Sequence, residues 1–249
     1  MTEDMTGDNT LAKNEIKNFI LKVDLINDGQ VEIAKIAEKM SEHFDRTEKK
    51  QLNKFSINFT KGSSEVTQGD TFDYVLVSEE KSISMTFSET QCAFWLESNQ
   101  YKDNSSYKGI MNKVVNVVKS LSSEVKSKRI GLRYINQFQC KTKRNIGKIY
   151  GKRLSSLVRT MLSEEDMQTR VIGMEEYNND GFKMRFQYGI PNKFYPSVIA
   201  VFDLLLDIDS FVESESGATE WEGLITNLNH AAYGKFVKEI NPKYLQDLK

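Results

Sequence analysis

Apolar and polar positions alternate along much of the chain, and this pattern predicts a sheet rich in hairpins. The clearest series lies at residues 72–77, 82–87 and 92–97, where polar segments of four residues separate the stretches. Successive side chains of a strand point to opposite faces, so such alternation is typical of half-buried strands. We expect an antiparallel meander here. Further strands are expected at residues 15–26, 54–60, 128–139, 170–177, 182–188 and 195–209.

A different spacing, with apolar residues three or four positions apart, predicts about four helices. These lie at residues 31–44, 106–121 and 152–162 and from Thr219 onwards, with one final turn at 243–248. Thr219 and Glu222 have the spacing of a capping box. Strands that come in hairpins, with helices between the runs, indicate an α+β fold with an antiparallel or mixed sheet.

Composition supports a folded chain of 249 residues, since 39% are hydrophobic. We expect a flexible tail at residues 1–12 and a single α+β domain at 13–249, or two subdomains that divide near 140–150. The polar, acidic start predicts no signal peptide, and the longest apolar run, 198–206, is broken by Asp203, so we expect no contact with a membrane. Cys92 and Cys140 are too few for a disulfide scaffold and indicate a cytosolic protein.

The net charge of −1 hides an uneven distribution. Residues 108–162 contain nine lysines, five arginines and one acid, Glu124, so this segment carries +13 and the remainder −14. Such a segment could attract phosphate or an acidic protein surface, or it could be neutralised within the fold. Its candidate anion- or nucleic-acid-binding residues are Arg129, Arg133, Lys141, Lys143, Arg144, Lys148, Lys152 and Arg153. Tyr150 is the candidate aromatic for stacking on bases.

The sharpest local motif is RIGLRYIN, at residues 129–136. In a strand, Ile130, Leu132 and Tyr134 share one face, and Arg129, Gly131 and Arg133 share the other. A glycine between two arginines lets a ligand or another backbone approach, which suits an anion site. The alternative is structural: a buried arginine that pairs with a carboxylate.

Three carboxylates, Asp203, Asp207 and Asp209, share one parity of the strand expected at 195–209. Such a set could bind Mg²⁺ and position a phosphoryl oxygen, so these residues are weak candidate metal ligands. The alternative is an ion pair with Arg133. The chain has no Walker loop, no dinucleotide-binding glycine motif and no HExxH. We therefore expect neither catalytic residues nor a cofactor.

RIGLRYIN also resembles the signature of a sporadically distributed, largely uncharacterised bacterial protein family of about this length. In that family a GLRYIN strand follows a helix, an LDID strand comes later, and the last helix carries a histidine, a phenylalanine and an isoleucine. Leu206 to Asp209 match the LDID strand, and Phe236 and Ile240 match the ending, but Asn229 stands at the histidine position. The resemblance implies no catalytic activity, and the family's patchy distribution is similar to that of mobile or defence loci.

Together these features predict a non-enzymatic binding or regulatory subunit in a bacterial cytosolic system, for phage defence or as part of a toxin–antitoxin pair. Its partner would be another protein subunit or a second copy of the chain. The alternative is a nucleic-acid- or nucleotide-binding protein that uses the basic 108–162 segment. A metal-dependent phosphoesterase is the third hypothesis.

Overall fold

The computed structural model describes residues 15–26, 32–60, 63–79, 82–99, 104–121, 125–162, 168–179 and 181–248, with backbone alone at 53–60, 63–69 and 104–106. The tail expected at 1–12 lies outside these residues. The fold is α+β, as predicted, and its sheet is antiparallel throughout. No helix among the described residues is long and apolar enough to cross a membrane.

One sheet joins strands from both ends of the chain. Its order is β2-β3-β4-β5-β1-β6-β9-β8-β7, with β10 paired to β6 off this path. The strands are β1 (Ile16–Leu25), β2 (Arg46–Thr60), β3 (Ser63–Ser78), β4 (Ile83–Ser88), β5 (Ala93–Ser98), β6 (Lys126–Phe138), β7 (Val171–Asn179), β8 (Phe182–Ile190), β9 (Leu204–Val212) and β10 (Ser216–Gly217). The expected meander forms β3 to β5, and β1 and β6 join it to the strands of the second half.

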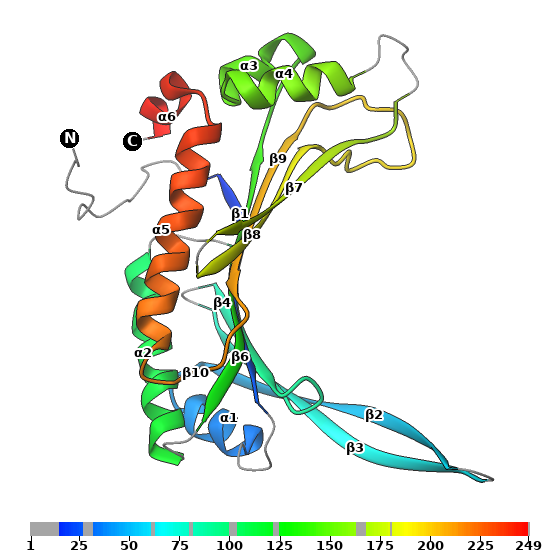
Figure 1. Ribbon diagram of the computed structural model, residues 1–249, viewed down its shortest axis with the longest axis vertical. Coiled ribbons are helices and arrows are strands. Elements are labelled where there is room, and N and C mark those ends of the chain that lie inside the picture. The colour runs from blue at the N-terminus through cyan, green and yellow to red at the C-terminus, as the bar shows by residue number, and fades with distance from the viewer. Residues whose placement is uncertain are drawn as a thin grey trace.

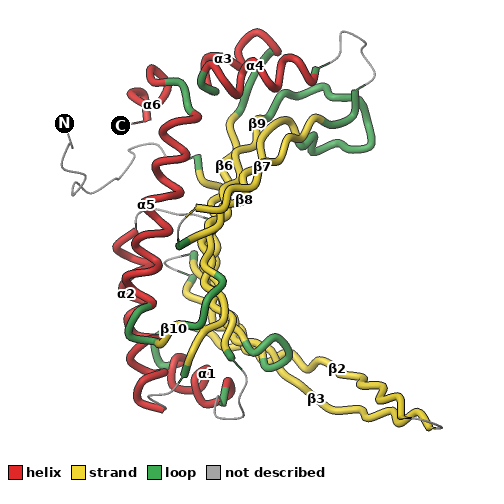
Figure 2. The backbone as a smooth tube through the Cα atoms, in the orientation of Figure 1, coloured by secondary structure: helices red, strands yellow, loops and turns green. Residues whose placement is uncertain are grey.

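The helices cover one face of this sheet. They are α1 (Ile33–Ser41), α2 (Asn104–Leu121), α3 (Ile146–Ile149), α4 (Lys152–Met161), α5 (Trp221–Glu239) and α6 (Pro242–Leu248), and a 3₁₀ turn, η1 (Lys143–Asn145), leads into α3. Figure 1 shows α1, α2 and α5 along the convex side of the curved sheet. Figure 2 shows that the concave side faces away from them and carries no helix of the described chain. We call this concave side the open face.

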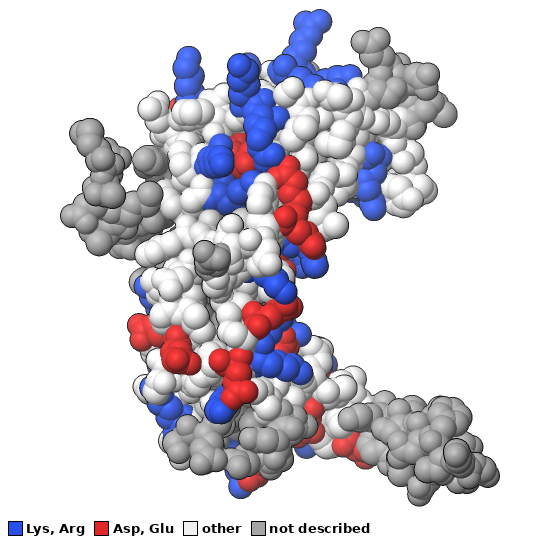
Figure 3. Space-filling model, viewed as in Figure 1, with Lys and Arg blue, Asp and Glu red and all other residues white. Residues whose placement is uncertain are grey.

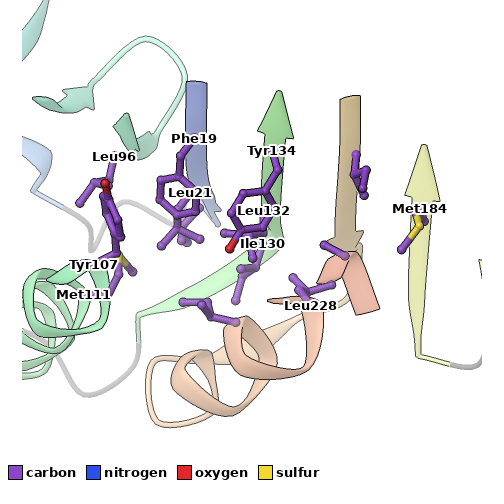
Figure 4. Close-up of a cluster of buried hydrophobic side chains, with 14 of the residues drawn as sticks. Phe19, Leu21, Leu96, Tyr107, Met111, Ile130, Leu132, Tyr134, Met184 and Leu228 are labelled. Atoms are coloured by element: carbon purple, nitrogen blue, oxygen red, sulfur yellow. The ribbon is translucent and has the colours of Figure 1, made fainter. Parts of the chain in front are cut away.

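The core lies between the sheet and its helices. Phe19 and Leu21 of β1, Leu132 and Tyr134 of β6, and Leu228 of α5 are all buried. Figure 4 shows that these side chains lie on the helical side of the sheet. Burial of such apolar side chains contributes on the order of 2 kcal/mol each, so this layer fixes which face of every strand turns outward.

Three sequence-based expectations on the elements are wrong. The described residues form six helices instead of about four, because α3 and α6 are separate short helices. The helix at the C-terminal end, α5, begins at Trp221 with Glu220 as its N-cap and no side-chain capping bond, so Thr219 and Glu222 form no capping box. Instead, a carboxylate oxygen of Glu220 accepts a hydrogen bond from the backbone N–H of Gly217, at 2.9 Å.

The strand expected at 195–209 begins only at Leu204. Residues 191–203 form a loop held by turns, in which the Asn192 side chain donates to the carbonyls of Thr169 and Ser197, at 2.8 and 2.7 Å. Pro196 has no N–H to give to a sheet ladder. In this loop Phe194, Tyr195 and Val198 are exposed, while Ile199 and Phe202 are partly buried against the core.

Candidate functional site

The RIGLRYIN residues occupy a central strand, with β1 on one side of β6 and β9 on the other. The alternation predicted from the sequence is confirmed: Ile130, Leu132 and Tyr134 are buried against the helices. Arg129 and Arg133 lie on the open face, where they line a shallow hollow of about 360 Å³ with Trp95, Glu97 and other residues.

Arg133 pairs with Asp207 of the neighbouring strand β9. Its Nε and one terminal nitrogen donate to the two carboxylate oxygens at 2.9 and 2.7 Å, a bidentate geometry. The Asp207 side chain is 6% exposed and that of Arg133 is 41% exposed. The hydrogen bonds from Arg133 to this carboxylate raise the pKa of the guanidinium. These two residues therefore form an ion pair, which was the structural alternative to an anion or metal site.

Arg129 fills the space above Gly131. A Cβ added at Gly131 would come within 2.8 Å of the Arg129 guanidinium, so the glycine accommodates this side chain of its own strand. The guanidinium stacks at 4.6 Å on the ring of Phe211. It also lies 3.5 Å from a carboxylate oxygen of Asp209 and 3.9 Å from one of Asp24. Both motif arginines are therefore engaged with carboxylates of the chain.

The hollow itself is not a prepared anion site. Lys22 binds Asp24 at 3.0 Å and the Gln91 side chain at 2.9 Å, and Glu97 and Asp209 bring negative charge into the lining. Burial raises the pKa of Asp209 despite the nearby cations Arg129 and Arg133. An anion that entered would meet these carboxylates and compete with Asp207 for Arg133. Binding of an anion by Arg129 and Arg133 therefore stays a prediction, and the anion would have to compete with the carboxylates that these arginines already contact.

The three candidate metal ligands do not share one strand face. Asp203 precedes β9, and its carboxylate lies 3.6 Å from the Lys193 ammonium, while Asp207 and Asp209 face Arg133 and Arg129. Within the described part of the chain, no three His, Cys, Asp or Glu side chains are grouped closely enough to hold a metal ion.

The basic segment 108–162 divides among three regions of the fold. Lys108, Lys113 and Lys119 lie on α2, and Arg129 and Arg133 lie on the open face of β6. Lys126 and Lys128 lie at the start of β6. The other seven cations gather around η1, α3 and α4 at one end of the molecule, where Figure 3 shows basic side chains over these elements. We call residues 141–159 the basic cap. Its sequence contains no acid, from Lys141 through to Arg159.

Two cap residues from the predicted set already have partners. Arg153 donates to both carboxylate oxygens of Glu239, at 2.6 and 3.1 Å, and to Glu175 at 2.7 Å. The Lys143 ammonium lies 3.4 Å from the carbonyl oxygen of Leu162. Lys141, Arg144, Lys148 and Lys152 have no carboxylate partner among the described residues, and each is exposed.

Tyr150, the candidate for stacking on bases, is buried, so this expectation is wrong. Its hydroxyl donates to the carbonyl of Leu205 and accepts from the backbone N–H of Gly189, at 3.3 Å in the second case. Burial raises the pKa of this phenol. The ring fills the space beneath β8 and β9 and cannot meet a base.

Two residues named by the family resemblance contact each other. The hydroxyl of Tyr134, in the motif, donates to the Asn229 side chain of α5 at 2.6 Å. His230, its neighbour, is exposed. This hydrogen bond joins the motif strand to the last long helix on the helical side of the sheet.

An apolar surface that the sequence did not reveal lies at the β7 edge of the sheet. Five of the seven exposed large apolar side chains in the described chain come from β7 and the loop after β8. These are Ile172, Met174, Phe194, Tyr195 and Val198, which we call the apolar stripe. Arg170 links its two parts, because its guanidinium lies 4.2 Å from the Tyr195 ring and the residue is two positions before Ile172. A sequence shows the alternation of β7 but not that β7 ends the sheet.

Comparison of the chain with protein-family models, with curated proteins and with solved structures finds no match. The resemblance to the GLRYIN family stays an expectation that rests on the motif residues.

Proposed function

We propose that this protein is a non-enzymatic binding subunit that associates through the β7 edge, and that the strand added there comes from a second copy of the chain. The apolar stripe carries this proposal. Exposed apolar residues scattered singly are ordinary, but a group on an edge strand is typical of a protein interface. The predicted setting, a bacterial cytosolic defence or toxin–antitoxin system, follows from the family resemblance and stays a prediction.

The residues of β7 are complementary to themselves when two copies run antiparallel. A pairing centred on Gly173 places Ile172 opposite Met174 of the second copy on the open face. The same register places Arg170, the residue before β7, opposite Glu176 of the second copy, whose carboxylate also binds Arg185 of its own chain at 2.8 Å. Each contact occurs twice because of the two-fold symmetry, so the pairing supplies two apolar pairs and two pairs of opposite charge. Backbone hydrogen bonds of the added strand would continue the sheet.

Charge-swap variants test this register. We expect the wild-type chain to sediment as a dimer, and Arg170→Glu or Glu176→Arg alone to shift it towards the monomer, because each places like charges opposite one another. The double variant Arg170→Glu/Glu176→Arg restores opposite charges and should restore the dimer. Analytical ultracentrifugation of the full chain over a range of concentrations measures this.

A matched pair of apolar substitutions controls for general effects on the surface. Met174→Asp should favour the monomer, whereas Leu157→Asp, on the exposed side of α4, should leave the dimer intact. Thermal melting confirms that each variant is folded. A wild-type chain that is monomeric at all concentrations would remove the proposal, as would a double variant that dimerises no better than the singles.

A further inference from the structure

We infer that the basic cap binds the phosphate backbone of double-stranded nucleic acid, without regard to its base sequence. Five cations carry this inference: Lys141, Arg144, Lys148, Lys152 and Arg159. None of these five residues belongs to the apolar stripe or to β7, so the inference does not depend on association through that edge.

The fold brings several of these cations together, and no carboxylate of the described residues pairs with them. Arg159 of α4 donates to the backbone carbonyl of Arg144 at 3.1 Å, and its guanidinium lies beside Gly147 of α3. Arg144 and Lys148 are four positions apart across η1 and α3, while the buried Ile146 and Ile149 face the core. Like charges held close together repel one another, so this arrangement becomes favourable when an anion lies across it.

Within the part of the chain that the structure describes, Glu239, Glu175 and Asp203 bind cations other than the five of the cap. Glu239 and Glu175 bind Arg153, and they also lie 2.8 and 3.8 Å from the Lys235 ammonium beneath the cap. Asp203 lies 3.6 Å from Lys193. Among the described residues, none of the five cap cations forms an ion pair with a carboxylate.

The composition of the cap favours a polyanion over a protein. Protein interfaces have an apolar, often aromatic centre, whereas the cap exposes one large apolar side chain, Leu157, among its cations. Phosphate contacts need only spaced cations. Single strands are commonly held by exposed aromatic rings, and the cap's tyrosine, Tyr150, is buried. The geometry therefore points to duplex backbone and not to unstacked bases.

A binding measurement with charge-matched variants tests the cap. Fluorescence anisotropy with a labelled random-sequence DNA duplex should show binding that weakens as salt rises, with a log–log slope of up to about −4.5 if all five cations contact phosphates. Arg144→Glu/Lys148→Glu should weaken binding at least tenfold. The control, Lys113→Glu/Lys119→Glu on α2, makes the same change in net charge at exposed positions of the same basic segment and should have a small effect.

The inference would be overturned by no binding at low salt, by binding that does not change with salt, by equal losses in both double variants, or by tighter binding to a single strand of equal charge. Tighter binding to polyglutamate than to the duplex would also overturn it, and would indicate an acidic protein as the ligand. Circular dichroism of both double variants checks that each keeps the helix and strand content of the wild-type chain.

Discussion

Arg133 and Asp207 show how far single residues could be read from the sequence. Strand alternation placed Arg129, Gly131 and Arg133 on one face, and the open face of β6 has this arrangement. From the sequence, Arg133 and Asp207 could serve either as ligand-binding residues or as an ion pair, because strand alternation allows their side chains to lie on the same sheet face. Which alternative holds depends on strand order: β9 lies directly beside β6, and no local pattern states that neighbour.

The unequal exposure of this ion pair predicts unequal costs of removing its two members. Arg133→Ala leaves a carboxylate that is 6% exposed without its bidentate partner, which should cost about 2–3 kcal/mol of unfolding free energy. Asp207→Ala leaves a guanidinium that water can reach, at 41% exposure, and should cost about 1 kcal/mol. Urea unfolding of each variant measures both values, and the double variant isolates the coupling between them.

Equal costs, or a larger cost for Asp207→Ala, would contradict this account of the pair. Such a result would mean that Asp207 is as well solvated as Arg133 in the folded chain. Asp207→Ala also bears on the phosphoesterase hypothesis. If the variant fails to fold while the wild type shows no Mg²⁺ binding in a titration, that hypothesis should be dropped.

Helices and strands were predicted well where apolar residues recur regularly over a long stretch, and poorly where turns interrupt that pattern. The long helix expected from Thr219 onwards forms as α5, and it buries Trp221, Leu228 and Phe236. The helix expected at 152–162 forms as α4, in which Leu154 and Val158 are buried but Leu157 is 38% exposed, because a short helix at the end of the sheet buries a narrow face. The strand expected from residue 195 was wrong because Pro196 and the Asn192 turn hold those residues in a loop.

A charged network joins α4, α5 and β7, and it was not evident from the sequence because its members lie far apart in the chain. Glu239 is 2% exposed in its side chain and binds both Arg153 and Lys235. The Lys235 ammonium also lies 4.2 Å from the Phe186 ring and 4.5 Å from that of Tyr177. Burial opposes the ionisation of Glu175, but the hydrogen bond from Arg153 helps keep the pKa of this carboxyl group below its usual value.

Glu239→Gln should therefore be strongly destabilising, although it hardly changes the size of the side chain. The substitution leaves Lys235, whose side chain is 10% exposed, with Glu175 at 3.8 Å as its remaining carboxylate. We expect a loss of about 3 kcal/mol, measured by urea unfolding. Glu38→Gln, at an exposed position of α1, is the matched control and should change stability by less than about 0.5 kcal/mol. Similar effects of the two substitutions would mean that the network does not hold these elements together.

For the whole molecule, the near-zero net charge combines surfaces of different character. The basic cap has no acid in its sequence, whereas cations and carboxylates alternate across the open face. There Arg133 is opposite Asp209, Asp209 is opposite Arg185, and Arg185 is opposite Glu176 in successive strand pairs. The excess of +13 in residues 108–162 is thus partly neutralised within the fold and partly displayed. Sequence arithmetic could not separate the two parts, because strand neighbours decide which cations meet a carboxylate.

Salt should therefore separate the two proposed interactions of the intact protein. Association through β7 rests on apolar pairs and on a few exposed ion pairs, which contribute about 0–1 kcal/mol each and are screened without large loss. Binding of duplex DNA by the cap depends on counterion release. If about three or more cations contact phosphates, the affinity should fall at least tenfold between 50 and 200 mM salt. Sedimentation at both salt concentrations, with and without the duplex, should show a dimer that persists while the DNA is released. Loss of the dimer together with the DNA would show instead that one electrostatic interface serves both interactions.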